Sequence, residues 1–408
     1  MIIEIIIALI IGIIAGTITG LTPGIHINLI ALITISFSET LLKITTPIIL
    51  AIFITSMAIT HTFLDFIPSI FLGAPNEDSF LSVLPGHKLL LEGRGYYAII
   101  FTLYGSLSAL FIILFFTPFF IFLVPFIYSK IQKIIPFILI IVCFLLIYSD
   151  KEKKISSFFI FLMAGFLGIA SLNLNVKEPL LPLLTGLFGA SNLIISINQK
   201  TIIPEQRINS IKNIKLSINS ILKSSLASMI SAPFTAFLPA IGTAQSALIG
   251  RYFLNIRDQR EFLFLIGAVN TIMMGLSFIT LYSINKTRTG ASAAISQLIP
   301  ELTLNHLFII GSTIIISGFL SFIIAVNISK IASKNIHKIA YHKLSKIILY
   351  ILILMIFIFS DNTFEGRIIS LLIFITSTSL GIFTISSNIK RMHLMGCLLV
   401  PTILFYLL

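Results

Sequence analysis

Residues 16–33 read GTITGLTPGIHINLIALI and place a Pro-Gly pair in the middle of an apolar segment. No Asp, Glu, Lys or Arg occurs from Ile5 to Ser38. A straight helix of that length would extend about 51 Å, whereas the hydrocarbon core of a membrane is about 30 Å thick. Pro23 lacks an amide hydrogen and disfavours helical geometry at Thr22, and Gly24 allows the backbone to turn. The segment is therefore predicted to break into two half-helices that form a re-entrant hairpin.

The composition of the whole chain supports a membrane location. Of its 408 residues, 57% are hydrophobic and 10% are charged, and the mean hydropathy is +1.08. A soluble core cannot bury so much apolar surface. The apolar runs have helix length and lack the strict alternation of an outer-membrane barrel. We therefore predict an all-α polytopic membrane protein with about 10–12 membrane segments.

A second segment repeats the design of the first. The stretch APFTAFLPAIGTAQSALIG (232–250) carries Pro239, and aligning 19–26 with 235–242 matches a Thr, a Pro and an Ile. Further along, 61–76 aligns with 270–285, each an apolar body between polar ends. Paired, interrupted segments in two halves of a chain are typical of transporters built from structural repeats. We predict a first repeat over 1–198, a basic linker over 199–223 and a second repeat over 224–408.

The net charge of +12 comes from short basic clusters between apolar runs, which indicates cytoplasmic loops and not a nucleic-acid surface. Loops 199–223 and 329–347 are both rich in lysine and are predicted to be cytoplasmic. Three apolar segments lie between these loops, so the loops can be on the same side of the membrane only if one segment, 224–250, is re-entrant and does not cross. Counting membrane crossings in the same way through the first half predicts that the hairpin of residues 5–36 opens to the outside. The two repeats are therefore predicted to be inverted relative to each other. The predicted location is the cell membrane, inner or plasma, with multiple crossings.

Half-helices that end inside a membrane expose amides or carbonyls that can bind an anion or a cation. The alternative is a Pro kink in an ordinary helix. The candidate substrate-binding residues line the two breaks: Thr19, Gly20, Thr22, Pro23, Gly24, His26 and Asn28 in the first, and Thr235, Pro239, Ala240, Gly242, Thr243 and Gln245 in the second.

Asp65 lies in an otherwise apolar stretch, one helical turn after His61. The pair is interpreted as an ion pair or proton relay, or alternatively as a hydrated helix end. The candidates for ion coupling are His61, Asp65, Asn76, Asn270 and Asn285. No third metal ligand and no hydrolase pattern accompany them, so we expect neither a metal site nor an enzyme. We expect no cofactor except a coupling sodium ion or proton. The remaining histidines, including His393, are interpreted as loop or interfacial residues without a role.

Four stretches resemble the TctA family, the large permease subunit of tripartite tricarboxylate transporters. AGTITGLTPGIHINLIALI resembles its first, Leu-Pro-Gly-containing signature, and FTAFLPAIGTAQSALIGRY resembles its second. GAPNEDSFLSVLPGHKLLLEGRGYYAI (73–99) and LPLLTGLFGASNLIIS (181–196) resemble two segments between them. The chain differs in having Leu64-Asp65-Phe66 where the family has a Gly-Gly-Ser-like stretch, and Pro239-Ala240 instead of Pro-Gly. It therefore resembles a divergent, short branch.

The resemblance implies an inverted-repeat permease that moves a small organic anion, typically a carboxylate, by symport with sodium or protons. Its implied partners are a periplasmic-type binding protein and a small membrane subunit, besides membrane lipid; a homodimer is left open and no nucleic acid is expected. Alternating access would occur around a midplane site. The alternative function is a lipid-linked phosphate (polyprenyl phosphate) translocase, which would use the same hairpins around a cavity open to lipid.

Overall fold

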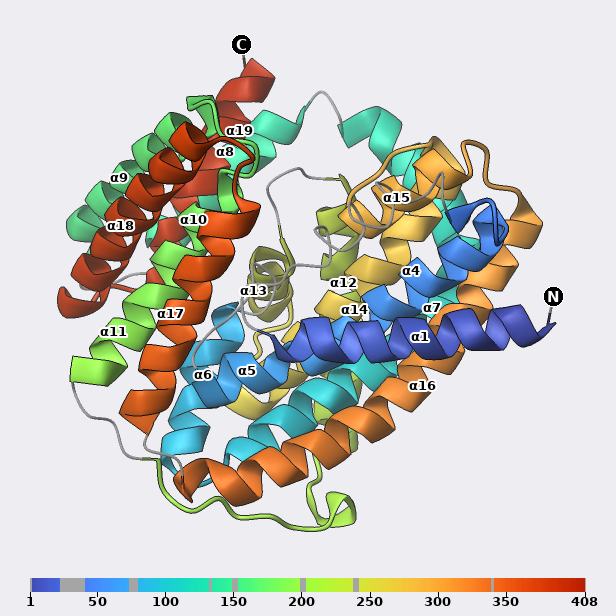
Figure 1. Ribbon diagram of the computed structural model, residues 1–408, viewed down its shortest axis with the longest axis horizontal. Coiled ribbons are helices and arrows are strands. Elements are labelled where there is room, and N and C mark those ends of the chain that lie inside the picture. The colour runs from blue at the N-terminus through green and yellow to red at the C-terminus, as the bar shows by residue number, and fades with distance from the viewer. Residues whose placement is uncertain are drawn as a thin grey trace.

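The computed structural model describes residues 2–22, 41–72, 80–131, 134–148, 153–198, 203–237, 242–338 and 341–407. Within these ranges every regular element is a helix (Figure 1). The predicted all-α architecture is therefore confirmed. Seven of the candidate site residues lie outside the described residues: Pro23, Gly24, His26, Asn28, Asn76, Pro239 and Ala240.

The helices of the first half are α1 (Ile2–Leu21), α4 (Pro47–Leu64), α5 (Phe66–Leu72), α6 (Phe80–Leu91), α7 (Gly95–Ile131), α8 (Ile135–Tyr148), α9 (Lys154–Asn173), α10 (Leu180–Leu184), the π-helix η2 (Thr185–Ala190) and α11 (Ser191–Asn198). After the 3-10 turn η3 (Ile211–Asn213) follow α12 (Ile218–Phe237), α13 (Thr243–Phe253), α14 (Gln259–Ile284), α15 (Gly290–Leu298), α16 (Leu304–Asn335), η4 (Ile336–Lys338), α17 (Tyr341–Phe359), α18 (Phe364–Ser386), η5 (Arg391–Met395) and α19 (Gly396–Leu407).

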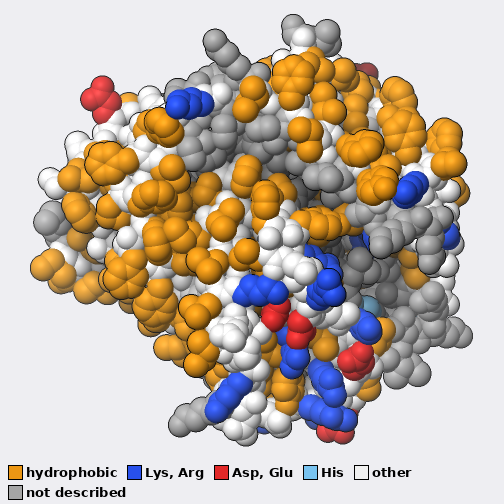
Figure 2. Space-filling view, turned by 180° about the vertical axis from the view of Figure 1, so that it is seen from behind, with side chains coloured by type: hydrophobic (Ala, Val, Ile, Leu, Met, Phe, Trp, Pro, Cys, Tyr) orange, Lys and Arg blue, Asp and Glu red, His pale blue; other side chains and the backbone are white. Residues whose placement is uncertain are grey.

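Seven helices in the described part of the chain are long and apolar enough to cross a membrane: 2–21, 47–71, 95–126, 154–173, 259–284, 304–338 and 364–386. Two shorter apolar stretches, 180–195 and 391–407, contain helix interruptions. Figure 2 shows the matching surface: hydrophobic side chains cover most of this face, and charged side chains gather toward its lower end. An apolar belt with a charged end fits a protein embedded in lipid.

Helices end at both of the expected places. Helix α1 ends at Leu21, two residues before Pro23, and α12 ends at Phe237, two residues before Pro239. Helix α13 begins after Gly242 and packs against α12, where the Ser246 hydroxyl donates to the carbonyl of Ser231. Residues 218–237 and 243–253 therefore form two separate helices that pack against each other.

Helix α1 lies along α4 because one of its faces carries glycine at every fourth position. A Cβ at Gly12 would collide with Ser56 Oγ, and a Cβ at Gly16 would lie 2.5 Å from the carbonyl oxygen of Met57. Small residues spaced by four let two membrane helices approach closely. This contact fixes the C-terminal end of α1 beside the end of α4.

Helices α4 and α14 form the centre of the fold. All residues from Phe262 to Leu281 of α14 are buried, as are nearly all from Ile49 to Leu64 of α4. Helix α7 packs on α14, and α16 packs on α4. A second group of helices, α8–α11 and α17–α19, lies on the left in Figure 1, where α19 crosses α9 and α18 crosses η2. The site is built on the first group.

Candidate functional site

Asp65 lies at the junction between α4 and α5, inside the span 47–71. Pro68 explains the interruption, since it has no amide hydrogen to donate to the carbonyl of Leu64. The Asp65 side chain is 1% exposed. A carboxyl group held at a break in a buried helix is costly unless other groups contact it, so its surroundings define the site.

Asn270 of α14 provides one such contact. Its Nδ2 donates to Asp65 Oδ2 at 3.2 Å, and Asn270 is itself 1% exposed. Next to this pair, the hydroxyl oxygens of Thr62 and Thr271 lie 3.2 Å apart and form a hydrogen bond. The two central helices are therefore joined by a buried polar cluster made of an acid, an amide and two hydroxyls.

Thr19 of α1 extends this cluster. Its Oγ1 lies 3.1 Å from His61 Nδ1, one helical turn before Asp65. Gly20 makes the approach possible, because a Cβ there would lie 2.8 Å from the Cβ of Leu64. Candidates that the sequence assigned to substrate binding (Thr19) and to ion coupling (His61, Asp65, Asn270) thus meet in one place.

The burial of His61 and Asp65 bears on the two interpretations of this pair. His61 is 5% exposed and lies within the span 47–71. Both side chains are therefore shielded from water within the fold, which favours the interpretation as an ion pair or proton relay over a hydrated helix end. Ionisable side chains buried in an apolar span are candidate functional residues.

The described residues of the second break lie on helices that pack against α14. Thr235 of α12 is buried, and its hydroxyl donates to the carbonyl of Ala232 at 2.6 Å. Gly242 is the N-cap of α13 and Thr243, buried, is its first residue. Gln245 lies in the first turn of α13. Since α14 also carries Asn270, the second break is connected to the polar cluster through this helix.

Asn285 is not brought to this cluster. It is the C-cap of α14, with a left-handed φ of 49°, and its side chain is exposed. It lies about 22 Å from Asn270 along the axis of the same helix, at a rise of 1.5 Å per residue. Asn tolerates the left-handed conformation that ends a helix, so its position has a structural explanation. Thr22, the last described residue of the first segment, donates to the carbonyl of Ile18 at 2.7 Å.

The sequence interpretation missed two buried groups in η5. Arg391 is 7% exposed, its Nη2 donates to the carbonyl of Phe188 in η2, and its guanidinium lies 5.5 Å from the Phe188 ring centroid. His393, interpreted as a loop or interfacial residue, is fully buried. Both follow Lys390 and resemble a cytoplasmic cluster in sequence. Only the return of the chain from α18 into η5 places them inside.

An all-α chain with seven apolar helices of spanning length in its described residues, and a buried polar cluster between two of them, is a multi-pass membrane protein. The model of the tripartite tricarboxylate transporter TctA family matches residues 6–396. The chain belongs to this family, which is a family of transporter permeases and not of enzymes.

One relative supports a divergent branch of the family. The chain is 33% identical over 361 residues to an uncharacterized protein of Methanocaldococcus jannaschii, covering 87% of this chain and 88% of that protein. No solved structure matches the chain.

Proposed function

We propose that this protein is a secondary active transporter that moves a small organic anion, a carboxylate, by symport with sodium or protons. The observation that carries the proposal is the buried contact between Asp65 and Asn270 in a chain of a tricarboxylate permease family. The family match does not favour the lipid-linked phosphate translocase. Transport would follow alternating access around the two broken segments.

The proposed architecture is two inverted repeats, 1–198 and 224–408, joined by the linker 199–223. The alignment of 61–76 with 270–285 pairs Thr62 with Thr271, and these two residues form a hydrogen bond with each other. A residue contacts its own counterpart at a two-fold axis. This contact supports a pseudo-two-fold axis that passes between α4 and α14.

The second helix group provides independent support for the repeats. IFLMAGFLGI (160–169) in α9 and IFITSTSLGI (373–382) in α18 share Ile, Phe, Leu, Gly and Ile at the same positions. A Cβ at Gly168 would collide with the carbonyl oxygen of Cys397, and one at Gly381 would meet that of Leu187. Gly168 and Gly381, which the alignment pairs, thus each lie against a backbone carbonyl of a neighbouring helix.

A third argument concerns the sides of the membrane. The backbone amide of Arg207 donates to the carbonyl of Gly93 at 2.7 Å, and Lys153 Nζ donates to the carbonyl of Ser387 at 2.7 Å. The other ends of α9 and α18 meet where the Lys177 amide donates to Asp361 Oδ2 at 2.8 Å. In each of these contacts, the predicted topology places both partners on the same side of the membrane. We therefore propose that loops 199–223 and 329–347 are cytoplasmic and that Asp361 faces outside.

We assign coupling to the cluster of His61, Asp65 and Asn270. A proton could be carried by the Asp65 carboxylate or the His61 imidazole, since both change charge on protonation. A sodium ion would use oxygen ligands, which Asp65, Thr62 and Thr271 provide. Binding of the cation would offset the negative charge at the junction and so couple to binding of the anionic substrate.

The substrate carboxylate would bind at the half-helix ends. Gly242, the N-cap of α13, makes no side-chain capping bond, so the first-turn amides of α13 are suited to an anion. Thr19, at the end of α1, is proposed to bind from the opposite break. As in the family, a binding protein and a small membrane subunit are the proposed partners.

Replacement of Pro23 or Gly24 by Leu tests the site assignment. Leu should extend α1 through the break and abolish uptake, while insertion into the membrane is retained because the segment becomes more apolar. The control Ile14→Leu changes an exposed residue of the same helix and should leave uptake unchanged. Wild-type uptake by the Pro23→Leu and Gly24→Leu variants would overturn the assignment.

A further inference from the structure

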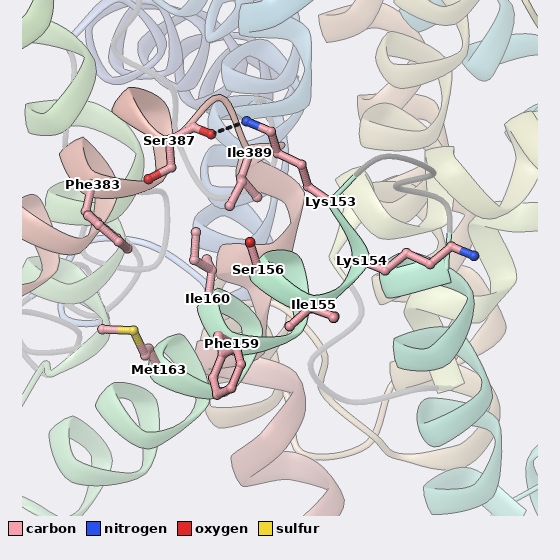
Figure 3. A pocket seen from close by; sticks show the side chains of 10 residues that line it. All are labelled: Lys153, Lys154, Ile155, Ser156, Phe159, Ile160, Met163, Phe383, Ser387 and Ile389. Carbon is pink, nitrogen blue, oxygen red and sulfur yellow. Dashed lines mark hydrogen bonds between the residues drawn. The ribbon is translucent and has the colours of Figure 1, made fainter.

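A pocket of about 850 Å³ lies between the beginning of α9 and the end of α18, far in sequence from the cluster around Asp65 (Figure 3). Its size is within the range of small-molecule sites. One end is polar, formed by Lys153 and Ser156 with Ser387 opposite; the rest is lined mainly by apolar side chains. The pocket thus has a basic end and an apolar groove.

The polar end is suited to a phosphate. Lys153 is the N-cap of α9 and makes no side-chain capping bond, and the first turn of α9 lines the pocket. The amides of a first turn and the helix dipole favour an anion. Lys153 Nζ donates to the carbonyl of Ser387 at 2.7 Å, which holds the ammonium over the pocket. An ammonium has three N–H donors, and Ser387 accepts from one of them.

The apolar end is suited to a hydrocarbon chain. Phe159 and Met163 follow one another on α9 at helical spacing and are 59% and 49% exposed; Phe383, on the opposite wall, is 52% exposed. Among the described residues, no acidic side chain lines this pocket. A ligand that fits must therefore combine a negative headgroup with an apolar tail.

We propose that this pocket binds one acidic phospholipid, with its phosphate at Lys153 and the first turn of α9 and its acyl chain along Phe159, Met163 and Phe383. The charge complementarity at the mouth and the apolar groove below it both favour lipid over a soluble anion. The site is independent of the transported substrate and of the cluster around Asp65.

Native mass spectrometry of the purified protein tests the proposal with phosphatidylglycerol, with phosphatidylcholine of the same acyl chains, and with inorganic phosphate. Phosphatidylglycerol should be retained more strongly than phosphatidylcholine. Lys153→Gln should lower its retention about fivefold, the factor corresponding to about 1 kcal/mol for one lysine near an anionic lipid surface. Lys334→Gln, at the exposed end of α16, removes the same charge elsewhere and should have no effect.

A second variant tests the groove without altering the headgroup contact. Met163→Trp should fill the groove and reduce lipid retention while Lys153 stays in place. Equal retention of the two lipids, or unchanged phosphatidylglycerol retention by both Lys153→Gln and Met163→Trp, would overturn the proposal. Binding of inorganic phosphate that depends on Lys153 and displaces the lipid would assign the pocket to a soluble anion instead.

Discussion

Asn270 Nδ2 lies 3.2 Å from Asp65 Oδ2, so an amide from α14 donates to a buried carboxyl group at the end of α4. The two residues come from the two proposed repeats, and each is 1% exposed. A change of charge on a buried acid alters the cost of keeping it out of water, so we expect protonation or cation binding at Asp65 to affect the packing of α4 against α14. In the proposed mechanism, this contact would link cation binding to movement of one repeat against the other.

Asp65→Asn should abolish cation coupling. The variant keeps the shape of the side chain and an oxygen that can accept from Asn270, but it removes the negative charge that would bind a sodium ion or a proton, so accumulation driven by a gradient should be lost. Gradient-driven uptake into proteoliposomes measures the change. Glu301→Gln removes an exposed acid and should transport normally. Full coupling in Asp65→Asn would exclude this residue from the cation site.

The glycine face of α1 should be needed for stability. A Cβ at Gly16 would lie 2.5 Å from the Met57 carbonyl and 2.6 Å from Thr60 Cβ, so Gly16→Ala should destabilise the protein by about 1–3 kcal/mol. At Gly311 of α16, no described atom lies within 4 Å of the position that a Cβ would occupy, so Gly311→Ala is the matched control and should be neutral or slightly stabilising. Thermal unfolding in detergent measures both. Equal melting temperatures for the two variants would contradict close packing of α1 on α4.

Thr19→Val tests whether α1 takes part in the site. The substitution keeps the branched shape and removes the hydroxyl that contacts His61 Nδ1 at 3.1 Å. We expect a severalfold lower uptake, in line with about 1 kcal/mol for one hydrogen bond, without loss of folded protein. Thr17→Val, on the same helix, should behave as wild type because its hydroxyl donates to its own helix, at Ile13. The assignment fails if the two variants transport equally well.

Asp361 should stabilise the loop between α17 and α18 in a pH-dependent way. Hydrogen bonds from the Thr363 amide and hydroxyl and from the Lys177 amide lower the pKa of the Asp361 carboxyl group below its ordinary value. A lowered pKa gives stability that is complete above the ordinary carboxyl pKa and is lost as the pH falls through the lowered one. Asp361→Asn should therefore lower the melting temperature at pH 7.

The difference between Asp361→Asn and wild type should shrink as the pH drops below about 4, where the Asp361 carboxylate of the unfolded chain begins to be protonated while that of the folded protein is still charged. Glu365→Gln, in the exposed first turn of α18, provides a control for loss of one negative charge. A difference in melting temperature that stays constant across this pH range would show that the carboxylate charge is not the stabilising feature.

Membrane sidedness can be tested with single cysteines. Lys215→Cys should react with an impermeant thiol reagent only from the cytoplasmic face, and Asn362→Cys only from the outside. Both positions are exposed, whereas the native Cys143 and Cys397 are buried and should react slowly. Labelling of both new cysteines from one face would contradict the proposed topology.

Local chemistry made the helix breaks predictable, because proline and glycine act on the backbone within a few residues. The ends of α1 and α12 follow directly from Pro23 and Pro239. Asp65 and His61 were also identifiable, since charge is rare inside apolar segments. Their partners were harder to find. The contact of Thr19 with His61 depends on the glycine spacing of α1, and that of Asp65 with Asn270 depends on how two distant helices cross.

Arg391 shows why other parts could not be predicted. Its neighbours Lys390 and His393 give the stretch the composition of a loop, and Arg391 is buried only because η5 packs against α9 and its guanidinium reaches Phe188 of η2. The shared residues of 160–169 and 373–382 did carry a signal for the second helix group. The shared stretch is short, and Ile-rich helices align with one another easily. The contacts of Gly168 and Gly381 with backbone carbonyls therefore add support for the repeat that the sequence alone does not provide.

The most direct test of the central claim is uptake of labelled mono-, di- and tricarboxylates into proteoliposomes under an imposed sodium or proton gradient, for wild type and Asp65→Asn, with and without the binding protein and small subunit. We expect wild type to accumulate at least one acid only with a gradient, and Asp65→Asn to accumulate none. Accumulation without any gradient, accumulation by both proteins alike, or no uptake of any acid by folded protein with its partners would contradict it.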